Sequence, residues 1–126
     1  MFSRVGQIML YVNNQDEAIR FWTEKLGFVV IAEEELDQGF RWIEIAPQKG
    51  AETSIILHDK KFVAEMSPGV NLDTPSLMFF TENLEQLHQD LSHKNITVGE
   101  ITSMPSGKVF NFADNEENYF AVMERR

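Results

Sequence analysis

Apolar and polar positions alternate at the start of the chain and then change to the spacing of a helix. Residues 7–12, QIMLYV, give one apolar face and one mixed face, which is typical of a β-strand whose two sides meet different surroundings. Asn14 stands three residues before Glu17, the spacing of a helix N-cap with a reciprocal acidic residue. Apolar side chains then recur at helical spacing as far as Gly27, which favours a left-handed helix end. The pattern predicts a strand, a turn and a helix of about three turns.

The same pattern returns 69 residues further along the chain, so we predict two copies of one supersecondary unit. Asn83 falls on Asn14, Gln86 falls on Glu17, and Asn95 replaces the closing Gly27. Runs of β-branched and aromatic residues predict the other strands. The expected strands cover residues 7–12, 28–34, 40–46 and 53–58 in the first copy and 76–81, 97–101, 108–113 and 119–124 in the second, whose helix covers residues 84–94.

This layout is two βαβββ modules, and we interpret them as one α+β domain covering residues 1–126. Module one covers residues 1–58 and module two covers residues 76–126. Residues 59–75 contain two prolines and a glycine with few periodic apolar positions, which indicates a connector with at most a short helical turn. The predicted strand of residues 28–34 ends in the acidic cluster Glu33-Glu34-Glu35, where we expect the chain to leave the core for a solvated loop.

Composition narrows the possible partners and the compartment. The net charge of −9 repels nucleic-acid phosphates and anionic membranes, so we expect neither as a partner. The longest apolar run, residues 28–32, is far shorter than the roughly 20 residues of a membrane span, and the N-terminus lacks a signal-type segment. The chain has no cysteine, which excludes disulfides and thiolate ligands and fits a reducing compartment. We expect a cytoplasmic protein.

Three segments resemble the vicinal oxygen chelate superfamily, which contains glyoxalase I, the bleomycin and fosfomycin resistance proteins and the extradiol dioxygenases. They are VNNQDEAIRFWTEKLGF (residues 12–28), SLMFFTENLEQL (residues 76–87) and FADNEENYFAVME (residues 112–124). In the third segment, Asp114 and Asn118 match the family's turn before the last strand. The resemblance implies the glyoxalase/bleomycin resistance/dioxygenase fold, in which two βαβββ modules curve their sheets around a shared cavity.

The resemblance also implies where a metal would be held. The family's enzymes place His, Gln or Glu ligands on the first and last strands of each module. The corresponding positions here are Gln7, Ile55 or Ile56, Ser76 and Ala121, of which only Gln7 is a ligand type of the family. Since a catalytic divalent ion needs about three His or carboxylate donors, we expect no metal cofactor. A rebuilt divalent-metal site from Gln7, Glu44 and His58 is the alternative.

Strand parity, combined with the family geometry, predicts which residues line the cavity. The predicted ligand pocket consists of Gln7, Met9, Tyr11, Trp42, Glu44, Ile56, Ser76, Met78, Phe80, Tyr119 and Ala121. Glu44 is the candidate catalytic residue, because a carboxylate inside an apolar strand is costly to bury unless it has a partner or a role. The alternative is an edge strand with Glu44 in water.

The leading hypothesis is a glyoxalase/bleomycin-resistance-type protein that binds a small organic molecule in the inter-module cavity without a metal. One alternative is a metal-dependent lyase, isomerase or dioxygenase, similar to lactoylglutathione lyase, with the rebuilt site. Another is a resistance protein that sequesters a drug, for which an acidic groove would suit a cationic ligand. We also expect a homodimer, since members of this family commonly pair and short modules leave sheet edges open.

Overall fold

The computed structural model describes residues 1–125, apart from the side chain of Gln38. The chain divides into two compact units, Met1–Pro75 and a second unit that begins at Ser76. The residues expected to form a connector belong to the first unit, because a helix follows the last strand of that unit directly.

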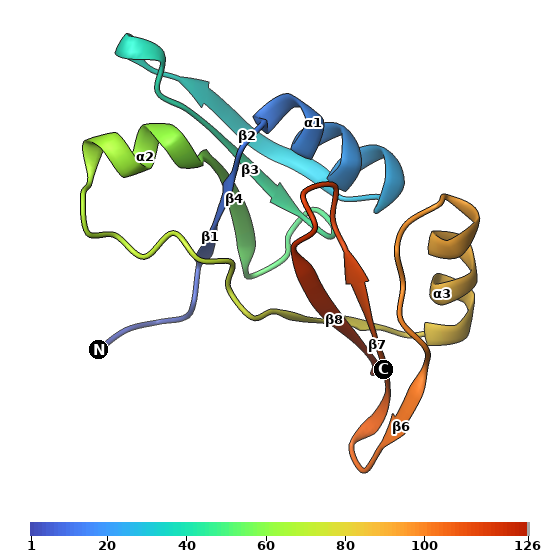
Figure 1. The fold of residues 1–126 in the computed structure, drawn as a ribbon. Helices are drawn as coiled ribbons and strands as arrows, with labels where there is room; N and C mark the ends of the chain where they lie inside the picture. Colours follow the sequence, from blue (N-terminus) through green and yellow to red (C-terminus); the bar gives the residue numbers. More distant parts are fainter. Residues whose placement is uncertain (126) are drawn as a thin grey trace. The chain divides into compact units, whose positions relative to one another are not determined.

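The first unit is a four-stranded sheet with helices in the order that the sequence predicts (Figure 1). Its strand order is β1-β4-β3-β2, with β1 parallel to β4 and the other neighbours antiparallel. The elements are β1 (Gln7–Val12), α1 (Gln15–Arg20), the π-helix η1 (Phe21–Lys25), β2 (Val29–Glu35), the short helix η2 (Asp37–Gly39), β3 (Arg41–Ala46), β4 (Ser54–Asp59) and α2 (Lys60–Met66).

The first helix begins and ends where the sequence predicts. The side chain of Asn14 accepts a hydrogen bond from the backbone N–H of Glu17 at 2.9 Å, which satisfies one of the free amides of the first turn. After the π-helical turn, Gly27 adopts a φ of 76°, a left-handed conformation that glycine takes without steric cost. Trp22 of η1 is fully buried together with Leu10 of β1 and Leu57 of β4. One face of the sheet is therefore covered by the helix.

The second unit repeats the topology of the first. Its elements are β5 (Met78–Thr81), α3 (Leu84–His93), β6 (Thr102–Met104), β7 (Gly107–Ala113) and β8 (Tyr119–Glu124), and its strand order is β5-β8-β7-β6. Asn83 caps α3 by accepting from the N–H of Gln86 at 3.1 Å, and Asn95 ends it with a φ of 62°. The α+β class and the two βαβββ modules predicted from the sequence are confirmed.

The turn that joins β7 to β8 is held by a buried carboxylate. Asp114 is only 6% exposed, and its carboxylate accepts from the N–H of Glu116, the N–H of Asn118 and the side-chain amide of Asn118 at 2.9 to 3.1 Å. Burial raises the pKa of Asp114, although these hydrogen bonds act in the opposite direction. The Asp and Asn that matched the family's turn thus hold this hairpin closed.

Two strand predictions are wrong in their bounds. Residues 97–101 do not form a continuous strand: Val98 makes an isolated bridge to Phe112, flanked by hydrogen bonds between residues 97–99 and β7, and the Gly99 carbonyl lies 2.8 Å from the His88 ring of α3. The strand forms later, at residues 102–104. The acidic cluster of residues 33–35 lies inside β2, where Arg41 of the neighbouring strand contacts Glu33 at 2.8 Å.

Ser76 precedes β5, so the fifth strand is shorter at its start than the sequence predicts. None of the helices in the described part of the chain has the length and apolar character that a membrane crossing requires.

Candidate ligand pocket

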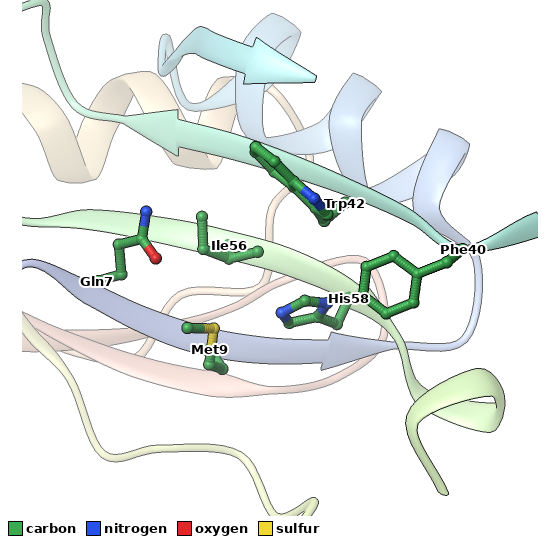
Figure 2. A pocket seen from close by; sticks show the side chains of 6 residues that line it. All are labelled: Gln7, Met9, Phe40, Trp42, Ile56 and His58. Carbon is green, nitrogen blue, oxygen red and sulfur yellow. The ribbon is translucent and has the colours of Figure 1, made fainter. Parts of the chain in front are cut away.

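A pocket lies in the first unit, on the sheet face opposite to the buried core. Six side chains from β1, β3, β4 and the residue before β3 line a volume of about 280 Å³: Gln7, Met9, Phe40, Trp42, Ile56 and His58 (Figure 2). Strand register explains this grouping, because Met9 pairs with Ile56 and Trp42 pairs with His58 across β4. Residues at alternate positions, such as Leu10 and Leu57, are buried on the other face.

The lining is apolar in the middle and polar at its ends. Met9, Trp42 and Ile56 form the floor and walls, and Met9 remains 37% exposed. Figure 2 shows Gln7 at one end of the group and His58 with Phe40 toward the other. A pocket of this composition offers dispersion contacts and three hydrogen-bonding side chains, those of Gln7, Trp42 and His58.

His58 is held by aromatic neighbours rather than by hydrogen bonds. Its ring stacks on Tyr11 at a centroid distance of 5.9 Å and meets the Phe40 ring at the same distance. Phe40 in turn packs against Phe62 of α2 at 5.0 Å. Nδ1 of His58 is buried without a hydrogen-bond partner, and burial lowers the pKa of the imidazole. His58 is therefore neutral at pH 7.

Glu44 does not lie on an edge strand, so that alternative is wrong. β3 is hydrogen-bonded to β2 on one side and β4 on the other. The Glu44 side chain is half-buried on the same face as Trp42, and its carboxylate accepts a hydrogen bond from the hydroxyl of Ser54 at 2.6 Å. This partner offsets part of the cost of burial. A catalytic role for Glu44 stays a prediction.

Four of the predicted pocket residues line this pocket, namely Gln7, Met9, Trp42 and Ile56. Tyr11 stands behind His58 as its stacking partner. Sequence reasoning omitted Phe40 from the pocket and placed His58 only in the alternative metal set. Phe40 has the same parity as Trp42 in the predicted strand of residues 40–46, and that was the available signal; in the structure it lies just before β3.

Comparison with known proteins places this geometry in a family. The model of the Glyoxalase/Bleomycin resistance protein/Dioxygenase superfamily matches residues 4–122. The chain belongs to this superfamily. It is 30% identical to YetH of Bacillus subtilis (strain 168) over 125 residues, which are 98% of this chain and 100% of YetH.

Two solved structures of the same superfamily fold are similar along nearly their whole length. TnmS3, an antibiotic binding protein from Streptomyces sp. CB03234, is 27% identical, with a TM-score of 0.82 and coverage of 99% of this chain and 98% of TnmS3. A superfamily member from Sphaerobacter thermophilus DSM 20745 is 22% identical with a TM-score of 0.82, covering 98% of both chains. The resemblance inferred from the three sequence segments is confirmed.

The metal-ligand positions of the superfamily do not carry a fitting donor set here. Ile56 faces the pocket and Ile55 faces the core, and neither can coordinate. Ser76 lies before β5. Ala121 lies on β8, where it pairs with Met78 of β5 and has no donor side chain. Across residues 1–125, no three His, Cys, Asp or Glu side chains gather closely enough to hold a metal ion.

The alternative set of Gln7, Glu44 and His58 does not converge either. Gln7 pairs with Ser54, four residues before His58 on β4, so about 13 Å of strand separates the two positions. The Glu44 carboxylate bonds to Ser54, at the Gln7 end. Donors that lie this far apart on the sheet do not meet the short donor–metal distances that a transition metal or Mg²⁺ requires.

The predicted pocket residues of the second unit share one face of its own sheet. Met78, Phe80 and Tyr119 are 48%, 65% and 59% exposed, and Ala121 lies opposite Met78. The guanidinium of Arg125 lies 5.7 Å from the centroid of the Phe80 ring. Their contribution to a cavity shared by both modules stays a prediction.

Proposed function

We propose that this protein binds a small, planar organic molecule in the pocket of its first unit, one molecule per chain, without a resident metal ion. The observation that carries the proposal is the apolar floor of Met9, Trp42 and Ile56 between two polar ends. Pockets of this kind bury most of a ligand's surface and orient it with a few polar groups.

The size of the pocket supports a ligand of two or three fused rings. An apolar cavity of about 150 Å³ in another protein is large enough to bind benzene. The volume of about 280 Å³ here is nearly twice that. The flat indole of Trp42 and the flexible thioether of Met9 are side chains suited to contact a planar ligand.

The lining favours binding over catalysis. It contains no Ser, Thr, Cys or carboxylate side chain that could attack a substrate, and His58 is its one side chain that could move a proton. The carboxylate of Glu44, on the same face, is hydrogen-bonded to Ser54. The metal-dependent lyase, isomerase or dioxygenase therefore ranks below a binding protein.

A specific form of this function is the sequestration of an antibiotic-like compound. It is favoured by the similarity to TnmS3, which is described as an antibiotic binding protein and matches this chain along its whole length. A sequestering protein lowers the free concentration of its ligand in proportion to the amount of protein. An enzyme of the superfamily would instead turn over many equivalents.

Intrinsic fluorescence tests the proposal directly, because the two tryptophans report on different places. Trp22 is fully buried in the core, whereas Trp42 lines the pocket. Planar bicyclic and tricyclic compounds are titrated into the wild type and into the Trp22→Phe and Trp42→Phe variants, with calorimetry as an independent measure of stoichiometry. We expect saturable quenching that persists in Trp22→Phe and is largely lost in Trp42→Phe.

Two results would reject the proposal. One is the absence of saturable binding of any compound up to millimolar concentration by calorimetry. The other is catalytic turnover on addition of Zn²⁺, Ni²⁺, Mn²⁺ or Fe²⁺, which would promote the enzyme to first place.

A further inference from the structure

The surroundings of His58, at one end of the pocket, indicate which chemical groups a ligand would need there. His58 lines the pocket, and it is the one lining side chain that has a buried ring nitrogen without a hydrogen-bond partner. Its ring is fixed between Tyr11 and Phe40, so it presents a defined edge rather than a rotating one. The following argument rests on the proposed function, since it concerns the same pocket.

The environment of Nδ1 decides the tautomer. A buried N–H without an acceptor is rarer in proteins than a buried acceptor without a donor, because the orphaned donor is the more costly of the two. In the neutral imidazole one nitrogen is a donor and the other an acceptor. With Nδ1 buried and unpartnered, the proton is placed on Nε2, the nitrogen that remains accessible to the pocket.

The charge of the lining restricts the ligand further. Gln7, Met9, Phe40, Trp42 and Ile56 have no formal charge, and His58 is neutral at pH 7. A charged group on the ligand would lose its hydration here without gaining an opposite charge, which is unfavourable. An uncharged acceptor, by contrast, would replace its water with the N–H of His58.

We propose that the pocket selects an uncharged, planar ligand with a carbonyl-type oxygen that accepts a hydrogen bond from Nε2–H of His58. Gln7 stands at the other end, about 13 Å away along the sheet, and its amide can donate or accept. A ligand that contacts both ends has a polar group at each extremity and an apolar body over Met9, Trp42 and Ile56. The specificity of the site then lies in His58 rather than in a metal.

A matched pair of probes separates the hydrogen bond from the apolar contacts. Fluorenone and fluorene are planar tricyclic molecules of nearly the same shape that differ in a carbonyl against a methylene group. Protonated aminoacridine supplies a planar cation of similar size. Dissociation constants for all three are measured by calorimetry at pH 7.5 with the full chain.

The wild type should bind fluorenone about fivefold more tightly than fluorene, within a range of roughly twofold to tenfold for one hydrogen bond. His58→Phe keeps an aromatic ring between Tyr11 and Phe40 but removes both nitrogens. That variant should bind fluorene as the wild type does and lose the preference for fluorenone. His93→Phe, at an exposed position of α3, is the matched control and should keep the preference.

The outcomes separate the two proposals. Equal affinity for fluorenone and fluorene in the wild type, or a preference that survives His58→Phe, overturns the role of His58 and leaves the binding function standing. If aminoacridine binds most tightly of the three probes and Glu44→Gln abolishes this binding, the role of His58 is overturned in favour of a cationic ligand. If none of the three binds, both the inference and the proposed function fail. NMR of the imidazole nitrogens gives an independent reading, since a proton on Nδ1 in the unliganded protein also overturns the inference.

Discussion

Replacing Trp42 with alanine should separate binding from folding. Trp42 lies on β3, an interior strand of the first sheet, and its half-buried indole forms one wall of the pocket. The other tryptophan, Trp22, is fully buried on the opposite, helix-covered side. The same substitution at these two positions therefore affects different surfaces of one unit.

The magnitude follows from the surface that a ligand would cover. An indole at the wall of a pocket offers on the order of 50 Å² to a planar ligand, which at about 25 cal/mol per Å² amounts to roughly 1.3 kcal/mol. Stacking geometry adds about 0.5–1.5 kcal/mol. Trp42→Ala should thus weaken binding of an aromatic ligand by about 1–3 kcal/mol, or roughly fivefold to a hundredfold.

The effect on folding should be smaller than at the core position. Truncation of a fully buried tryptophan costs about 3–5 kcal/mol, so Trp22→Ala should reduce the free energy of unfolding by that amount. Trp42→Ala should cost about 1–2 kcal/mol, because part of its ring already meets solvent. Calorimetric titration with fluorenone and urea unfolding measure the two quantities on the same samples.

One pattern would refute this reasoning. If Trp42→Ala leaves ligand affinity unchanged while stability falls as far as in Trp22→Ala, Trp42 is a core residue and the pocket is not the binding site.

Three further predictions rest on the described contacts and the donor set, and a fourth rests on the expectation of a homodimer. Burial lowers the pKa of His58, so its contribution to stability is complete above about pH 6.5 and is lost as the pH falls from there toward the folded-state pKa. His58→Phe should flatten the pH dependence of the urea midpoint in that window, and an unchanged slope would contradict this prediction. Asp114→Ala removes a buried acceptor of three hydrogen bonds and should cost about 2–3 kcal/mol in urea unfolding, with a smaller loss for Asp114→Asn; equal losses would count against this role of Asp114 in the turn. Elemental analysis should find well under one divalent metal ion per purified chain. A site saturated at a metal concentration a thousand times its dissociation constant would add about 4 kcal/mol to the free energy of unfolding and raise the melting temperature visibly. A rise on addition of metal that Glu44→Ala or His58→Ala abolishes would overturn the metal-free proposal. Light scattering at tens of micromolar should give the mass of a dimer, and a monomer would refute that expectation.

Local patterns in the sequence predicted the elements well. Asn14 and Asn83 mark helix starts because a short side chain can cap the first free amides in only a few chain conformations. Alternation along β1 assigned Met9 to one face and Leu10 to the other, since a strand has a period of two. The repeat of both signals 69 residues apart was enough to predict two βαβββ modules.

Pairing between distant strands decided what the sequence alone did not determine. Residues 97–99 hydrogen-bond to β7, and the Gly99 carbonyl lies beside the His88 ring of α3, whereas β6 itself begins at Thr102. Arg41 of β3 forms an ion pair with Glu33 of the neighbouring strand β2. Neither side-chain contact has a local signature, since each joins residues of different elements that only the tertiary structure brings together.

The predicted ligand pocket differs from the pocket in the structure for the same reason. Strand parity and the family geometry together predicted that Met9 and Trp42 face the cavity, and the superfamily's ligand position on the fourth strand predicted Ile55 or Ile56 there. The inclusion of Phe40, the ring stack that fixes His58, and the hydrogen bond that ties Glu44 to Ser54 depend on side chains meeting across three strands. The sequence by itself therefore determined which residues face the pocket side of the sheet, and the tertiary structure decided which of them surround a common volume, because contact distance depends on the pairing of segments that are far apart in the chain.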